Sequence, residues 1–208
     1  MLRALLVFAF PFATMLADQP TLDRIPFQGA QGRIDLADIP IAKDPAGDGA
    51  AELGRLRASA ERGDLEAQAR LGVMYYWGEG APMDWQEAKG WLRKAAERGS
   101  MDAQAKLGAM FFLGQGGARD LDESVKWFRM AAEQGEPYAQ GCMGVMCAVG
   151  EGLPKDLVQA YVWLSQALFG GDSDAAEPLA QVKIRLTPAQ LQEAERRVGR
   201  VVKTRSAN

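Results

Sequence analysis

Ala60-Glu61-Arg62-Gly63 recurs as Ala96-Glu97-Arg98-Gly99 and as Ala132-Glu133-Gln134-Gly135, and each copy begins 36 residues after the one before it. Other residues keep the same register, among them Gly72, Gly108 and Gly144 and the tryptophans Trp91, Trp127 and Trp163. A period of a few tens of residues is typical of a solenoid, in which each unit buries its apolar face by stacking on its neighbours. The quartet therefore predicts one elongated repeat domain.

Each repeat is expected to form two helices joined by a loop. In the first repeat, the first helix runs from Leu65 to Trp77 and ends at Gly78, because glycine readily adopts the left-handed conformation that closes a helix. The second helix runs from Trp85 to Arg98, and Glu87 stands where its side chain can bond back to the helix cap. Aspartates that can cap the second helices recur at Asp84, Asp120 and Asp156. The predicted fold class is all-α, an α/α superhelical solenoid of helix pairs.

The repeat array leaves distinct segments at both of its ends. Residues 50–62 match the second half of a repeat and predict an N-terminal capping helix, and three full repeats follow over 63–170. Residues 171–203 begin as a fourth unit but lack the Gly-x-Gly loop, and Thr187-Pro188-Ala189-Gln190 carries the start signals of a last helix. A degenerate helix pair of this kind is expected as the C-terminal cap of a solenoid, followed by a tail over 204–208.

The N-terminal residues predict export. Arg3 precedes an apolar run from Ala4 to Leu16, which is too short for a spanning helix of about 20 residues, and small Ala17 follows. Residues 1–17 are interpreted as a signal peptide, and the mature protein as periplasmic or secreted with no stable membrane insertion. The alternative is an unprocessed apolar segment that packs on the first helix. Residues 18–49 hold four prolines and no helical period, which predicts an extended or disordered lead-in.

Composition excludes several classes of function. The formal net charge of −3 argues against nucleic-acid binding, which needs a basic face. The chain contains no histidine, so Ser-His-Asp and Cys-His mechanisms and histidine-ligated zinc are ruled out. No metal or other cofactor is expected.

Several motifs together resemble the Sel1-like repeat. They are the Ala-Glu-x-Gly quartet, Ala67-x-x-x-Leu71-Gly72-x-x-Tyr75, Gly78-Glu79-Gly80, Asp84 and Ala88-x-x-Trp91. The resemblance covers about residues 50–198 and implies an α/α solenoid related to tetratricopeptide repeats. It also implies an adaptor that holds other proteins, in bacteria often in the cell envelope. The third repeat departs from the pattern, with Met143 at the leucine position and Cys147 at the tyrosine position.

Cys142 and Cys147 are the only cysteines. Five residues along a helix correspond to about 140° around its axis, so the two thiols point apart and a disulfide between them would distort the helix. Some exported Sel1-like proteins carry a cysteine pair in each repeat that staples its two helices, and this chain does not. Both residues are therefore predicted to be free thiols at buried positions.

Catalysis is the rival class of function, because some exported cysteine-rich relatives are described as binding or hydrolysing β-lactams. The chain has no Ser-x-x-Lys, and no thiolate is expected near a positive group, so no machinery for hydrolysis is visible. The repeated Gly-x-Gly follows helices, whereas phosphate-binding loops follow strands. The repeated aspartates are more readily helix caps than one active site. The interpretation is therefore a protein that is not an enzyme.

Helical periodicity selects a candidate binding face. On the first helix, Ala67, Leu71, Met74 and Tyr75 fall on one side, which is expected to be the core face. The opposite side is expected to line the inner, concave groove of a tetratricopeptide-like stack. The candidate partner-binding residues on that side are Glu66, Val73, Tyr76 and Trp77 in the first repeat, Asp102, Phe112 and Leu113 in the second, and Tyr138 in the third. The alternative for the apolar residues Trp77, Leu113 and Val149 is that they pack one repeat on the next.

The predicted function is a non-catalytic adaptor or scaffold of the bacterial cell envelope, which binds a protein or peptide of unknown identity on the concave face of its first helices. Two alternatives stay open. One is an envelope enzyme or ligand binder that acts on peptidoglycan or β-lactams, and the other is a purely structural spacer.

Overall fold

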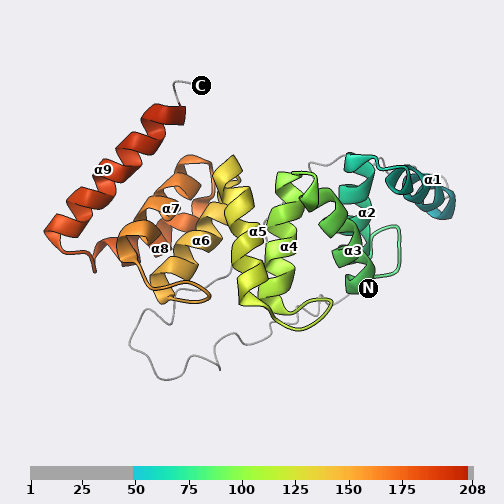
Figure 1. The fold of residues 1–208 in the computed structure, drawn as a ribbon, viewed down its shortest axis with the longest axis horizontal. Coiled ribbons are helices and arrows are strands. Elements are labelled where there is room, and N and C mark those ends of the chain that lie inside the picture. Colours follow the sequence, from blue (N-terminus) through green and yellow to red (C-terminus); the bar gives the residue numbers. More distant parts are fainter. Residues whose placement is uncertain (1–48, 206–208) are drawn as a thin grey trace, which may run out of the picture.

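The computed structural model describes residues 49–205, and every regular element in that range is a helix. The predicted signal peptide over 1–17 and all but the last residue of the predicted lead-in over 18–49 lie outside the described residues. Figure 1 shows the helices side by side in one elongated row, with α1 at one end and α9 at the other. The predicted all-α solenoid is confirmed. Among the described helices, none combines the length and the apolar character that crossing a bilayer requires.

The helices follow one another in pairs along the chain. The three pairs are α2 (Leu65–Trp77) with α3 (Trp85–Glu97), α4 (Met101–Leu113) with α5 (Leu121–Gln134), and α6 (Pro137–Val149) with α7 (Leu157–Phe169). The elements outside these pairs are α1 (Gly49–Glu61) before them, and a 3₁₀ turn η4 (Ser173–Ala175), α8 (Ala176–Lys183) and α9 (Pro188–Arg205) after them. The predicted bounds of the first helix coincide with those of α2.

Aspartate caps fix where the second helices begin, as predicted. The carboxylate of Asp84 accepts hydrogen bonds from the backbone N–H groups of Gln86 and Glu87 at 2.9 and 3.1 Å. Asp120 and Asp156 cap α5 and α7 in the same way. Glu87 was expected to bond back to the cap, but its carboxylate instead accepts the indole Nε1–H of Trp91 at 3.1 Å. The first helices have caps of their own that were not predicted, at Asp64, Ser100 and Glu136.

The Gly-x-Gly loop both ends a first helix and lets the next repeat approach. Gly78 closes α2 with a φ of 71°, and its N–H donates to the carbonyl of Met74 at 2.9 Å. The second glycine of the second loop, Gly116, also has a positive φ, of 67°. A Cβ at Gly116 would lie 2.5 Å from the backbone oxygen of Trp85, which belongs to the preceding repeat. The loop therefore needs glycine for packing as well as for conformation.

The paired helices approach closely because the first helix of each pair carries a glycine at the contact. A Cβ on Gly72 would lie 2.6 Å from the side chain of Leu92, which places α2 and α3 in direct contact at this point. Equivalent contacts recur in the next two repeats, between Gly108 and Phe128 and between Gly144 and Leu164. The small residues on one helix and the large residues on its partner allow tight helix packing.

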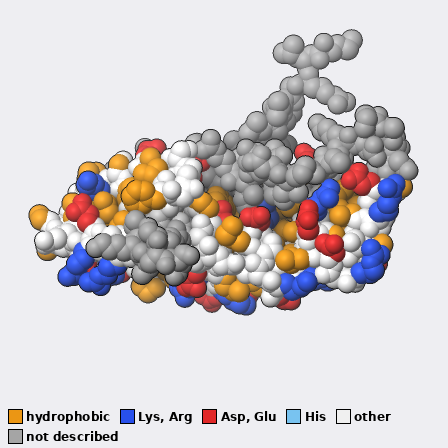
Figure 2. All heavy atoms as spheres, turned by 90° about the horizontal axis from the view of Figure 1, so that it is seen from above, with side chains coloured by type: hydrophobic (Ala, Val, Ile, Leu, Met, Phe, Trp, Pro, Cys, Tyr) orange, Lys and Arg blue, Asp and Glu red, His pale blue; other side chains and the backbone are white. Residues whose placement is uncertain are grey.

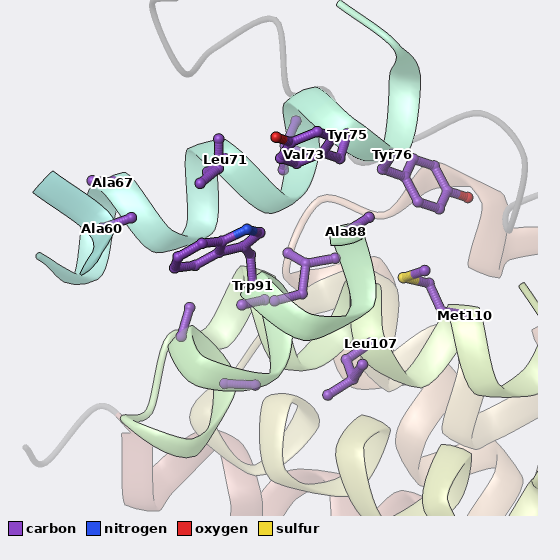
Figure 3. Packing of buried hydrophobic residues seen from close by; sticks show 14 of the residues in the cluster. Ala60, Ala67, Leu71, Val73, Tyr75, Tyr76, Ala88, Trp91, Leu107 and Met110 are labelled. Atoms are coloured by element: carbon purple, nitrogen blue, oxygen red, sulfur yellow. The ribbon is translucent and has the colours of Figure 1, made fainter. Parts of the chain in front are cut away.

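The array has two layers, because equivalent helices also lie beside one another. Lys106 of α4 lies over the rings of Tyr76 and Trp77 of α2, so the first helices are neighbours. Arg93 of α3 pairs with Glu123 of α5 at 4.0 Å, so the second helices are neighbours as well. The buried core lies between the two layers. Figure 3 shows part of it, with Leu71 of α2 facing Trp91 of α3 and with Leu107 and Met110 of α4 below.

Buried glutamines join each first helix to the end of the preceding helix. The glutamine side-chain N–H groups donate to backbone carbonyls at 3.0 Å: Gln68 to Ala60, Gln104 to Ala96 and Gln140 to Ala132. In the first two repeats the glutamine oxygen accepts a hydrogen bond from a side chain at the end of the second helix of the same repeat, Arg98 for Gln68 and Gln134 for Gln104. In the third repeat, the position that corresponds to Arg98 and Gln134 is Gly170, which has no side chain. Among the described residues, nothing donates to the buried oxygen of Gln140.

Candidate functional site

Four of the predicted binding residues are buried. The exposed fraction is 7% for Tyr76 and 2% for Phe112, and Val73 and Tyr138 are buried as well. The prediction that these side chains lie opposite the core is therefore wrong. Its physical cause is that a first helix packs against its own second helix and against the second helix of the preceding repeat, so that every residue of α4 from Ala103 to Phe112 is buried. The core face predicted for α2 is confirmed, since Ala67, Leu71, Met74 and Tyr75 are all buried.

The other four candidates reach the surface to different extents. Glu66 and Asp102 are exposed in the first turns of α2 and α4. Trp77, at the end of α2, keeps 45% of its surface exposed. Leu113, at the equivalent position of α4, is half-buried and packs on the second core cluster. The alternative that these residues pack one repeat on the next therefore fits Leu113 better than it fits Trp77.

Trp77 belongs to a group of three side chains at the junction of the first two repeats. Its ring meets that of Tyr76 edge to face, with centroids 4.8 Å apart. The Tyr76 hydroxyl donates to the side-chain oxygen of Gln115 at 2.9 Å, which ties α2 to the loop after α4. Lys106 places its ammonium nitrogen 4.7 Å from the Tyr76 ring centroid and 5.2 Å from that of Trp77. The group combines an exposed ring, a buried ring and a cation.

Lys106 is a buried cation that the sequence did not single out. It is 5% exposed, and burial lowers the pKa of its ammonium group from 10.5 to about 8, although the charge of Glu136 acts to raise it. No described residue accepts a hydrogen bond from its ammonium group or forms an ion pair with it. The signal that was available is its place in an apolar run, since Lys106 is the only charged residue between Ala103 and Leu113.

Glu136, near Lys106, is engaged as a helix cap. Its carboxylate accepts the N–H of Tyr138 at 3.1 Å and the N–H of Ala139. Burial raises the pKa of Glu136, the two backbone hydrogen bonds act to lower it, and the charges of Asp102 and Asp172 raise it further. Carboxylates therefore lie along the N-terminal ends of the first helices, and the one whose charge acts on Lys106 already accepts backbone hydrogen bonds.

Phe112, the counterpart of Tyr76 in the second repeat, is also covered by a cation. The guanidinium carbon of Arg119 lies 4.8 Å from the centroid of the Phe112 ring. Its Nε–H donates to the carbonyl oxygen of Phe112 at 2.8 Å, and its far end pairs with Glu151 of the next loop. Arg119 thus has carboxylate and carbonyl partners, whereas Lys106 has neither.

The two cysteines are buried free thiols, as predicted. Burial raises the pKa of Cys142 well above its ordinary value, and it raises that of Cys147 to about 11. The nucleophilic form of cysteine is the thiolate, so these values disfavour reactivity at neutral pH.

The layer of second helices carries charged groups that join successive repeats. Glu123 accepts the indole N–H of Trp127 at 2.8 Å and pairs with Arg93 of the preceding repeat, and Glu87 likewise pairs with Arg57 of α1 at 3.5 Å. Figure 2 shows apolar, acidic and basic side chains interspersed along one face of the array, with cations at both ends. This pattern is typical of a solvated surface that uses ion pairs between neighbours.

The features that would support small-molecule chemistry are weak in the described part of the chain. A pocket of about 210 Å³ lies between α7, α8 and α9, below the roughly 300–1,000 Å³ that is usual for ligand sites. Its lining includes Tyr161, Leu168 and Phe169 from α7 and Val198 from α9. Residues 49–205 contain no group of three or more Cys, Asp or Glu side chains placed to hold a metal ion.

Comparison with known proteins identifies the repeat. A family model described as Sel1 repeat matches residues 65–100, 102–136 and 137–168. A Sel1 repeat protein from Oxalobacter formigenes is 38% identical, with a TM-score of 0.57, and the match covers 62% of this chain and 98% of that protein. No curated protein sequence matches the chain.

A second solved structure is similar to this chain over part of its own length. It is a protective antigen of uropathogenic Escherichia coli strains that displays an SLR fold, and it is 34% identical with a TM-score of 0.67. The match covers 73% of this chain but 32% of that protein, so the chain spans about a third of the antigen.

Proposed function

Because the chain belongs to the Sel1 repeat family, we propose that it is a non-catalytic scaffold that binds a protein or peptide along the inner face of its first helices. Proteins of this family are generally protein-interaction scaffolds. A location in the bacterial envelope is part of the proposal, and it rests on the signal-like residues 1–17.

One observation carries the choice of face. Trp77 stands half-exposed at the end of α2, and the equivalent positions of α4 and α6 hold Leu113 and Val149, which are partly exposed. These three apolar side chains therefore recur once per repeat along the layer of first helices. Tryptophan is enriched among residues that dominate binding energy, and a row of apolar side chains at a fixed spacing suits an extended segment of a partner.

The test compares two tryptophans of similar exposure. Trp77→Ala should weaken capture of partners from an envelope extract by about tenfold or more, because a ring at the centre of an interface contributes at least about 1–2 kcal/mol. Trp85→Ala is the matched control, since Trp85 is 40% exposed but lies at the start of α3 in the other layer. Co-purified proteins are identified by mass spectrometry, and affinity is then measured on the partner identified.

Melting must be recorded for every variant used in that comparison. Tyr76→Ala is unsuitable as a binding probe, because truncating a buried ring costs about 3–5 kcal/mol of stability and weakens binding indirectly. Trp77→Ala protein that melts close to the parent and captures the same partners with the parent's affinity would exclude this face. Equal loss for Trp77→Ala and Trp85→Ala would also count against it.

A further inference from the structure

The ammonium group of Lys106 has no hydrogen-bond acceptor among the described residues. An ammonium group has three N–H donors and no acceptor, and a buried cation is costly unless it is paired. The two aromatic rings near it supply attraction to a positive charge but no hydrogen-bond acceptor. The charge of Glu136 acts on Lys106, but the oxygens of Glu136 accept the backbone N–H groups of Tyr138 and Ala139 instead.

We propose that the ammonium group of Lys106 is the anchor for an acidic side chain of the bound peptide, an inference that rests on the proposed function of the inner face. A carboxylate supplies both the countercharge and the acceptor oxygens that this ammonium group lacks. The exposed ring of Trp77 lies beside the cation and gives the apolar residues next to the acidic one a surface to cover.

The depth of Lys106 selects a side-chain carboxylate over the free carboxyl end of a chain. The residue is 5% exposed, but its ammonium nitrogen is not fully enclosed. A carboxylate on a methylene stem reaches a recessed cation while the backbone of the peptide stays at the level of Trp77. A terminal carboxylate is attached directly to the backbone and lacks this reach.

The other groups that face Lys106 fit this assignment. From α2 it meets Tyr76, whose pKa is raised by burial, so that this phenol stays neutral at physiological pH. From the N-terminus of α6, the charge of Glu136 acts on it, and the pKa of Glu136 is also raised by burial. Glu136 repels an incoming carboxylate but does not pair with the cation, and this limits the site to one acidic residue rather than a run of them.

Binding of an acidic side chain must be linked to the titration of Lys106. An opposite charge within about 4–6 Å raises the pKa of a lysine by about 1–3 units. By reciprocity, a peptide that raises this pKa by about one unit binds nearly tenfold more weakly at pH 10 than at pH 7. A neutral peptide that covers the same face shows no such dependence on this group.

The experiment follows the side-chain resonance of Lys106 by NMR in the full chain with ¹³C-labelled lysine, identified by its absence in Lys106→Met protein. Three pentapeptides are the probes: Ac-Ala-Leu-Glu-Leu-Ala-NH₂, its Gln analogue, and Ac-Ala-Leu-Ala-Leu-Ala with a free carboxyl end. The glutamate peptide should raise the pKa from about 8 by about one unit or more, and the other two should not. Lys106→Met should abolish the preference for glutamate over glutamine.

Lys89→Met is the matched control. Lys89 lies over the ring of Phe111 at 3.8 Å and belongs to α3, so its removal should leave the preference for glutamate intact. Several results would overturn the anchor: a pKa near 10.5 before any peptide is added, no response to millimolar glutamate peptide, or an equal response to the peptide with the free carboxyl end. If partner capture still depends on Trp77 in any of these cases, the proposed face stands and only the anchor fails.

Discussion

At the scale of single residues, Lys106 couples the stability of the fold to pH. Its pKa in the folded protein, about 8, lies below the ordinary 10.5 of an unfolded lysine. Between these two values the unfolded chain binds more protons than the folded one, so the free energy of unfolding rises as pH rises through this window. Below pH 8 Lys106 is charged in both the folded and the unfolded protein, so the full cost of burying this charge lowers the free energy of unfolding.

Lys106→Met should therefore stabilise the protein at neutral pH. A shift of about 2.5 pKa units corresponds to roughly 3 kcal/mol, which is the upper limit of the gain. The gain should shrink as the pH is raised from 8 to 10.5, because the parent loses its buried charge there. Urea unfolding of both proteins at pH 7, 9 and 10.5 checks this. A constant difference at all three values would show that side-chain packing rather than charge separates the two proteins.

At the scale of helices, a glycine sets how closely α2 and α3 approach. A Cβ on Gly72 would lie 2.6 Å from Cγ of Leu92 and 3.0 Å from its backbone nitrogen, so the helices must separate to admit it. Gly72→Ala should cost about 1–3 kcal/mol, as overpacking of a core does. Gly90→Ala in α3 is the control, because nothing lies within 4 Å of the added methyl group.

The two substitutions should act in opposite directions. Alanine in an open helical position stabilises by about 0.5–1 kcal/mol relative to glycine, so Gly90→Ala should raise the melting temperature while Gly72→Ala lowers it. Thermal unfolding followed by circular dichroism is sufficient. A rise for both variants would show that the contact between α2 and α3 is looser than described.

The bounds of the helices could be predicted from the sequence better than which of their faces are buried. Helix bounds follow from local signals, so that Gly78 and Asp84 marked the end of α2 and the start of α3 correctly. The burial of Tyr76 did not follow, because a repeat considered on its own shows one core face, and only the packing of neighbouring repeats buries the flanks of the first helices as well. Lys106 escaped notice for the same reason, since its surroundings come from two other helices.

At the scale of the whole molecule, protection should be graded along the array. Helices α4 and α5 have neighbours on both sides, whereas α1 packs chiefly on α2, and α9 packs chiefly on α7. In a solenoid, stability is approximately a sum over units and their interfaces, so end units open more easily than central ones. Native-state hydrogen exchange should therefore be slowest in α4 and α5 and fastest in α1 and α9. Uniform exchange across 49–205 would indicate one cooperative unit instead.

The two-layer row of helices also has a consequence for how the chain is made and how it can change. The main packing partners of each helix lie within the next two helices or so along the chain. A newly synthesised chain can therefore begin to fold from its first repeats while later ones are still being added, without waiting for distant segments. For the same reason, duplication or loss of one 36-residue unit would lengthen or shorten the molecule by a fixed step and leave every type of contact in place. We therefore expect related proteins to differ in their number of repeats more readily than in the residues of their core.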